Sequence, residues 1–228
     1  MRMKWMQAVV FVAGVAALGA ACPAQTSANG QAQANAATPA PAKAANEPEF
    51  SIGAGFYEAM NQSTNGNGTQ QTTTNSGGGM LELRFIDRPL MGFEFTYSYN
   101  SANQTIAPAA NCSTDLDCNT IPPLKVKASE VGLDYVFSKK FGSIRPFAVG
   151  GLGFFISSPN NSTYEVQTVV RPTYIFGGGL DWAALAHFGI RAQFRDNFYK
   201  APNLSSFNDP TGQFTSTAEP MAGLYYKF

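Results

Sequence analysis

The feature that most constrains the fold is a period of two in the hydropathy of most of the chain. In the stretch 91–99 every odd residue is large and apolar or aromatic, and every even residue is glycine or polar. The stretches 131–137 and 188–195 repeat this alternation. Because successive side chains of a strand point to opposite sides, each stretch predicts a β-strand with two chemically different faces.

The alternation predicts eight strands, and residues 143–156 show it least clearly. Their expected ranges are 49–60, 79–87, 90–100, 125–137, 143–156, 165–182, 186–199 and 216–228. The connections alternate between long and short, beginning with a long Gly/Asn/Thr/Gln loop at 61–78. This pattern is typical of outer-membrane barrels, with short turns in the periplasm and long loops outside. We therefore expect an all-β fold, an eight-stranded antiparallel transmembrane β-barrel preceded by a signal peptide and a disordered linker.

The two predicted faces differ in charge. The face with the larger residues carries no charged side chain, whereas the opposite face carries seven acids and six bases. A basic side chain that faces lipid at the midplane costs about 2–4 kcal/mol, so the charge-free face is expected to face lipid. A soluble barrel would reverse the two faces, but the export signal, the loop alternation and the C-terminus favour the membrane barrel.

The charged face is then expected to line the lumen. Eight strands enclose a space that side chains just fill, and a lone buried charge is costly, so acids and bases are expected to pair there. Glu49 lies on this face at the start of the first strand. The expected lumen network consists of Glu82, Arg84, Glu94, Glu130, Asp134, Arg145, Arg171, Asp181, Arg191, Arg195, Glu219 and Lys227.

The N-terminus carries an export signal. Arg2 and Lys4 precede an apolar stretch that ends near Ala21 and is shorter than the roughly 20 apolar residues of a spanning helix. Residues 1–21 are therefore predicted to be a signal peptide, with an uncleaved anchor as the alternative. Residues 22–48 are rich in Ala, Gln, Asn and Pro and predict a low-complexity periplasmic linker, which leaves 49–228 as the barrel domain.

Cys22 directly follows the sequence Leu-Gly-Ala-Ala at 18–21. This arrangement resembles a lipoprotein signal-peptidase site, at which the cysteine becomes lipidated. Gly19 departs from that motif, which usually has Leu there. Lipidation of Cys22 and ordinary cleavage after Ala21 or Ala24 both remain open.

Composition argues against several function classes. Lys and Arg together number 15 and so do Asp and Glu, so the chain lacks the basic excess of a nucleic-acid-binding protein. One His and three Cys leave little material for a metal cage, and no cofactor is expected. His187 falls in or beside a predicted periplasmic turn, and Glu130 and Asp134 are better explained as lumen partners than as an acid–base pair. We therefore do not expect an enzyme.

The last strand carries a resemblance to known proteins. Gly223, Leu224, Tyr226 and Phe228 resemble the C-terminal signal read by the barrel-assembly machinery, although Met221 stands where a polar residue is usual. Together with 145–153 and 176–181, they make the chain similar to the small outer-membrane β-barrel family, which includes the OmpA transmembrane domain, OmpX and OmpW. The resemblance implies the outer membrane of a Gram-negative-type bacterium. It also implies contact with outer-membrane lipids and lipopolysaccharide, and recognition by the assembly machinery.

Two function classes follow from these expectations. The first is a structural or surface-interaction barrel, with a packed charged lumen and long extracellular loops that meet an extracellular ligand the sequence does not name. The alternative is a small channel for hydrophobic solutes, as in OmpW, and a lipid A-modifying enzyme ranks third.

Two cysteines lie in the longest predicted loop, 101–124. Cys112 and Cys118 are separated by five residues on the predicted outer side, where disulfides persist, so they are predicted to form a disulfide. A calcium loop at Asp115 and Asp117 is the alternative, but the segment lacks the Gly and the final Glu of such loops.

Overall fold

The computed structural model describes residues 48–88, 90–108, 121–160, 167–204 and 211–228. Within these ranges the chain forms strands only, and no helix is long and apolar enough to span a bilayer. Cys22, Cys112 and Cys118 lie outside the described residues, so lipidation and the disulfide remain predictions. The strands are β1 (Glu49–Ala59), β2 (Gln62–Gly66), β3 (Thr69–Thr73), β4 (Ser76–Arg88), β5 (Met91–Pro108), β6 (Ile121–Ser138), β7 (Ile144–Pro159), β8 (Val169–Trp182), β9 (Phe188–Lys200) and β10 (Phe214–Lys227).

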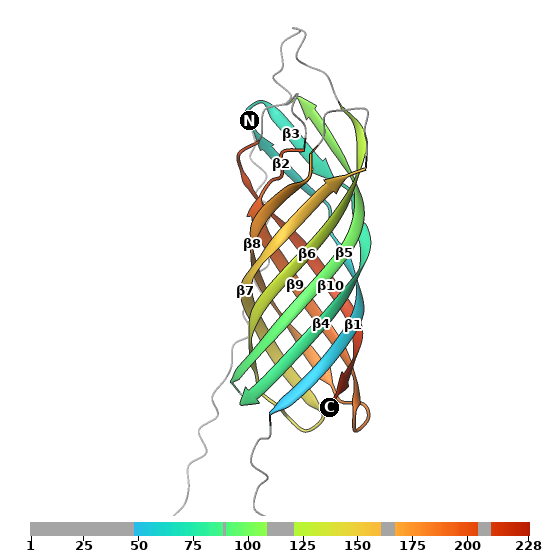
Figure 1. The fold of residues 1–228 in the computed structure, drawn as a ribbon, viewed down its shortest axis with the longest axis vertical. Coiled ribbons are helices and arrows are strands. Elements are labelled where there is room, and N and C mark those ends of the chain that lie inside the picture. Colours follow the sequence, from blue (N-terminus) through green and yellow to red (C-terminus); the bar gives the residue numbers. More distant parts are fainter. Residues whose placement is uncertain (1–47, 89, 109–120, 161–166, 205–210) are drawn as a thin grey trace, which may run out of the picture. The chain divides into compact units, whose positions relative to one another are not determined.

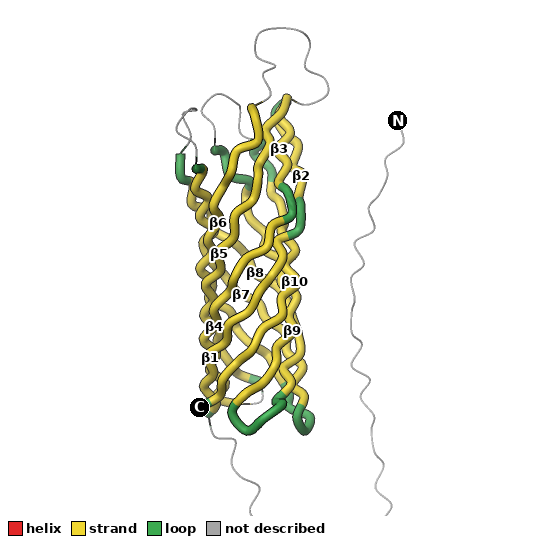
Figure 2. The backbone as a smooth tube through the Cα atoms, turned by 90° about the vertical axis from the view of Figure 1, so that its right-hand side faces the viewer, coloured by secondary structure: helices red, strands yellow, loops and turns green. Residues whose placement is uncertain are grey.

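Eight of these strands close into an antiparallel barrel (Figures 1 and 2). β1 and β4 to β10 each pair with two neighbours in the ring, which is completed where β1 pairs with β10 and β5 pairs with β6. At the β1–β10 seam Ser51 is opposite Lys227, and the Phe228 amide donates a hydrogen bond to the Phe50 carbonyl at 3.0 Å. The predicted all-β, eight-stranded antiparallel barrel is therefore confirmed, whereas the signal peptide and most of the linker lie outside the described residues and remain predictions. We call the end with the short turns the inner end, and the opposite end the outer end.

The first long connection is not the loop that the sequence predicted. Residues 62–73 form the hairpin β2–β3, and β3 pairs with the outer part of β5, from Thr73 opposite Gln104 to Thr69 opposite Pro108. The turn consists of Asn67 and Gly68, whose φ angles are 48° and 73°. Asn-Gly with positive φ at both positions is the preferred two-residue hairpin turn. The hairpin gives β5 a partner above the barrel, which explains why β5 extends to Pro108, well beyond the expected end at residue 100.

The outer surface of the barrel is an apolar belt. Leu133 is 60% exposed and Phe93 and Phe95 point outward, as the alternation predicted. An apolar surface that surrounds a barrel in this way is stable in a bilayer and not in water. Charged side chains return to the outward face towards the outer end of the strands, at Glu58, Lys125, Lys127, Asp196 and Lys200.

The belt generates the first prediction. Leu133→Arg places a guanidinium against lipid and is expected to lower the free energy of unfolding in vesicles by about 2–4 kcal/mol, measured by urea titration. Lys127→Arg, on the same face of β6 but outside the belt, serves as the control and is expected to have little effect. Equal stability of wild type and Leu133→Arg would show that this face does not contact lipid.

Candidate functional site

The lumen is filled by buried ionic side chains at the level of the apolar belt. Two arginines from opposite sides of the barrel form its centre. Arg84 on β4 places Nη2 2.5 Å from Glu94 Oε2 and Nη1 3.0 Å from Asp181 Oδ2. Arg191 on β9 places Nε 2.7 Å from Asp181 Oδ1 and Nη1 2.8 Å from Glu82 Oε2. Asp181 therefore joins the two arginines, and these five side chains are at most 5% exposed.

Strand register explains half of this network. Arg84 is directly opposite Glu94 across β4 and β5, and Asp181 is directly opposite Arg191 across β8 and β9. Opposite charges at such paired positions stabilise a sheet locally. The contacts of Arg84 with Asp181 and of Arg191 with Glu82 join strands that are not neighbours, so they cross the lumen and exist only because the barrel closes.

A second layer lies nearer the outer end. Arg195 Nη2 is 3.1 Å from Glu130 Oε1 and 3.5 Å from Asp134 Oδ2. Two glycines make room for this layer. A Cβ at Gly151 would lie 2.2 Å from Asp134 Oδ1, and one at Gly132 would lie 2.6 Å from Thr96 Oγ1.

Of the remaining predicted lumen residues, Glu219 lies directly opposite Arg195 across β9 and β10, and the others lie apart from these layers. At the inner end Arg145 holds Glu49 through two contacts of 2.7 and 3.0 Å, and Lys227 lies 3.6 Å from the same carboxylate. Arg171 is half-buried near the outer end of β8, and Glu219 is buried in β10. Within the described ranges, neither Arg171 nor Glu219 has an oppositely charged group within 4.0 Å.

The charge balance of the buried lumen differs from the near-equality that the sequence predicted. Its described part contains three arginines and six carboxylates, because Arg145 and Lys227 sit at the inner end and Arg171 is only half-buried. The buried arginines are Arg84, Arg191 and Arg195, and the buried carboxylates are Glu82, Glu94, Glu130, Asp134, Asp181 and Glu219.

Aromatic side chains, which the alternation had not been used to place, also lie inside the barrel. The guanidinium carbon of Arg84 lies 4.0 Å from the ring centre of Phe147, a distance at which the ring face attracts the cation. Farther out, the rings of Phe155 and Tyr199 stack with centres 4.4 Å apart. Phe147 and Phe155 share the inward parity of β7, so strict alternation could have placed them there.

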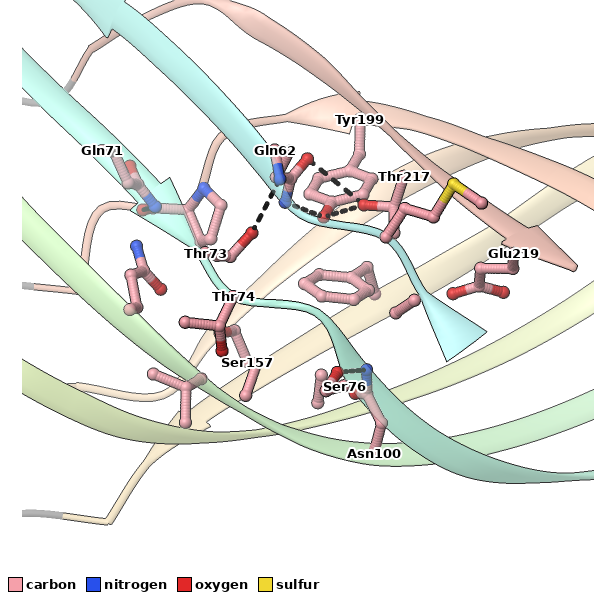
Figure 3. A pocket seen from close by; sticks show the side chains of 18 residues that line it. Gln62, Gln71, Thr73, Thr74, Ser76, Asn100, Ser157, Tyr199, Thr217 and Glu219 are labelled. Atoms are coloured by element: carbon pink, nitrogen blue, oxygen red, sulfur yellow. Dashed lines mark hydrogen bonds between the residues drawn. The ribbon is translucent and has the colours of Figure 1, made fainter. Parts of the chain in front are cut away.

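The outer mouth of the lumen is lined by neutral polar groups, apolar side chains and the carboxylate of Glu219 (Figure 3). Gln62 Nε2 donates to the Tyr199 hydroxyl at 2.8 Å, and the Thr215 hydroxyl donates to Gln62 Oε1 at 2.8 Å. These groups border a cavity of about 50 Å³. Still farther out, four buried apolar side chains pack together, namely Ile106, Leu124, Val126 and Leu204. The hairpin and the segment after β9 therefore close over the charged layers.

Two features of the described residues bear on chemistry: metal-ligating groups and the position of His187. No group of three or more His, Cys, Asp or Glu in this part of the chain is arranged to hold a metal ion. His187 lies at the inner turn between β8 and β9, where its Nδ1 is 3.0 Å from the Lys227 carbonyl and its ring stacks on Tyr226. These contacts are those of a histidine that orders a turn.

Comparison with known proteins identifies the class of fold. No protein-family model and no curated protein matches the sequence. Ail of Yersinia pestis, solved with the heparin analogue sucrose octasulfate, superposes with a TM-score of 0.50 at 15% identity over 80% of this chain and 99% of Ail. Neisserial surface protein A superposes with a TM-score of 0.51 at 14% identity over 78% and 97%. The outer-membrane enzyme PagL matches with a TM-score of 0.32, which is too low to carry an argument.

The chain therefore has the fold of the small outer-membrane β-barrels, as its resemblance to that family implied. Identities this low establish the fold and not a role, since one fold hosts many functions.

The lumen network generates the second prediction. Arg191→Gln leaves Glu82 and Asp181 buried without their closest cation and is expected to cost about 3–5 kcal/mol of unfolding free energy. Lys227→Gln removes the same charge at the exposed inner end and is expected to cost about 0–1 kcal/mol. Urea unfolding of both variants in vesicles gives the comparison. Similar losses for the two would mean that the buried contacts do not hold the barrel together.

Proposed function

We propose that the protein is an outer-membrane barrel whose lumen is a structural core and whose outer end binds partners outside the cell. The observation that carries this proposal is the pair of ionic contacts that cross the lumen, Arg84 with Asp181 and Arg191 with Glu82. Side chains committed to such buried pairs hold opposite walls together and fill the space that a passing solute would need.

The outer end supports a surface role. The hairpin β2–β3 and the long strands β5 and β6 extend the wall beyond the apolar belt (Figure 1). The hairpin is rich in Thr, Gln and Asn, and Ser63, Asn65 and Gln70 are exposed on it. Neutral amide and hydroxyl groups on a rigid hairpin suit hydrogen bonding to an external macromolecule, because the hairpin loses little conformational freedom on binding.

The channel alternative is disfavoured by the same contacts. Arg84, Arg191 and Arg195 are at most 2% exposed, so the described lumen is tightly packed in both of its ionic layers. To conduct a hydrophobic solute, the three arginines would have to separate from their carboxylates without water to solvate them. Such a separation costs much free energy in a low-dielectric interior.

The surface role generates the third prediction. Replacing residues 60–75 with Asn-Gly joins Ala59 directly to Ser76, its partner across β1 and β4, and removes the hairpin while keeping the barrel wall. Cells that display the wild type are expected to bind at least one immobilised extracellular-matrix protein or glycan more strongly than cells that display the variant. Heat-modifiable gel migration verifies that both proteins are folded.

Two results would contradict the proposed role. One is equal binding of wild-type, hairpin-deleted and non-expressing cells to every surface offered. The other is stable conductance of the wild type in planar bilayers, which would favour the channel.

We also propose that the assembly machinery reads the C-terminal residues Gly223, Leu224, Tyr226 and Phe228. Phe228 is 68% exposed, and its ring lies 5.0 Å from that of Tyr226 and 5.4 Å from that of Phe50. The terminal aromatic groups thus remain accessible at the inner end of the seam.

This proposal generates the fourth prediction. Phe228→Ala is expected to reduce folded barrel in outer membranes several-fold, while the purified variant refolds normally in detergent micelles. Phe214→Ala, which removes an exposed ring at the opposite end of the same strand, is the control and should insert normally. Wild-type amounts of folded Phe228→Ala in cells would refute the assembly role.

A further inference from the structure

We propose that the cavity at the outer mouth of the lumen binds a monovalent inorganic cation, with Glu219 as its charged ligand. Four independent features support this site: the size of the cavity, the oxygen atoms around it, an unpaired buried carboxylate that points into it, and the negative charge balance of the lumen below.

The cavity has the size that a small cation requires, and oxygen-bearing side chains occur in its lining beside apolar ones such as Met60, Val126 and Phe155. Its volume of about 50 Å³ exceeds the roughly 10–15 Å³ that one water occupies, so an ion and a few waters fit. Figure 3 shows Ser76, Asn100, Ser157 and Thr217 around it, contributed by β4, β5, β7 and β10. Hydroxyl and amide oxygens of this kind are hard ligands, which suit hard cations.

Glu219 is a buried carboxylate that forms no ion pair with the described residues, although Arg195 lies directly opposite it across β9 and β10. The residue is 4% exposed, no basic side chain of the described residues lies within 4.0 Å, and its Oε2 has no hydrogen-bond partner. In Figure 3 its carboxylate points from β10 towards the middle of the cavity. Arg195, the arginine of the neighbouring layer, is engaged by Glu130 and Asp134. A buried carboxylate without a counter-charge is unstable, and a cation in the adjoining cavity would supply that charge.

The rest of the lumen favours a cation over an anion. The described buried part contains six carboxylates and three guanidinium groups. In its outer layer Arg195 contacts Glu130 and Asp134, and Glu219 is its neighbour across β9 and β10, so three carboxylates surround one guanidinium group. The field in the cavity is therefore negative. Divalent ions such as calcium are usually held by several carboxylates, and no group of three or more acidic, His or Cys ligands occurs among the described residues. One carboxylate with neutral oxygens matches the single charge of Na⁺ or K⁺.

The rival occupant is a proton on Glu219 itself, which would neutralise the carboxylate without any ion. The groups that face this carboxylate include Glu130 and Arg195 within the lumen and Asn197 beside it on β9. The two explanations differ in one measurable respect, because a proton gives no dependence on the identity of the metal cation.

Cation-dependent stability is the test and the fifth prediction. The full-length wild type is unfolded with urea in NaCl, in KCl and in N-methyl-D-glucamine chloride at equal ionic strength and pH. Na⁺ or K⁺ is expected to increase the folding equilibrium constant in proportion to its concentration above Kd, by about tenfold at ten times Kd, whereas the bulky N-methyl-D-glucamine cation is not. Glu219→Gln keeps the side-chain shape, is expected to fold because it removes an unpaired charge, and should respond equally to all three salts. Glu58→Gln removes an exposed carboxylate from the outer wall and should retain the wild-type response.

A direct readout complements stability. Crystals grown with Tl⁺ are expected to show an anomalous peak in the cavity near Glu219, and crystals of Glu219→Gln are expected to lack it. Equal wild-type stability in the three salts, with or without greater stability of Glu219→Gln, would assign a proton to Glu219 and overturn the proposal. A cation response that persists in Glu219→Gln, or a Tl⁺ peak confined to other positions, would also overturn it.

Discussion

Backbone hydrogen bonding without water is the constraint on which the rest of this structure depends. In a bilayer every backbone N–H and C=O must find a partner within the protein, so a sheet can span it only if it has no edge. The seam between β1 and β10 meets this requirement, with paired residues from Ser51–Lys227 to Tyr57–Met221. One face of every strand of the closed barrel meets lipid, which explains why the apolar residues alternate along each strand so that they stay on its outward face, from Phe50 in β1 to Leu224 in β10.

Closure with only eight strands creates a second demand, because the enclosed space must be filled. The barrel fills it with charged and aromatic side chains and leaves room for them with glycines such as Gly132 and Gly151. Arg84 illustrates how the lumen compensates for burying charge: it contacts two carboxylates and the face of Phe147. The result is a core of ionic contacts inside an apolar belt, the reverse of a soluble domain.

The outer end has a different composition because it lies beyond the apolar belt, where side chains and backbone can contact water. Neutral amides and hydroxyls replace the arginines, and the sheet grows outward through β2–β3 instead of ending at the membrane. Glu219 lies at the boundary between the two regimes, where the charged layers meet the neutral mouth. Among the described residues no basic side chain lies within 4.0 Å of its carboxylate. The negative charge of Glu219 is therefore not balanced by an ion pair, and this is the reason a cation is proposed there.

The sequence by itself determined which face of each strand meets lipid and which lines the lumen, because a period of two is a local property of a strand. The alternation over 91–99 was sufficient for that region. Asn67-Gly68 could also have revealed the hairpin, had its turn chemistry been weighed above the loop-like composition around it.

Only the tertiary structure decided which charges meet. Parity places Arg171 and Arg191 on the same face, but the height of each residue along a tilted strand decides its partners. Arg191 therefore reaches Glu82 across the lumen, while Arg171 near the outer end reaches no described carboxylate. The tilt of the strands, and with it the height of each residue along the barrel, is set when the barrel closes. No local pattern in the sequence predicts these quantities.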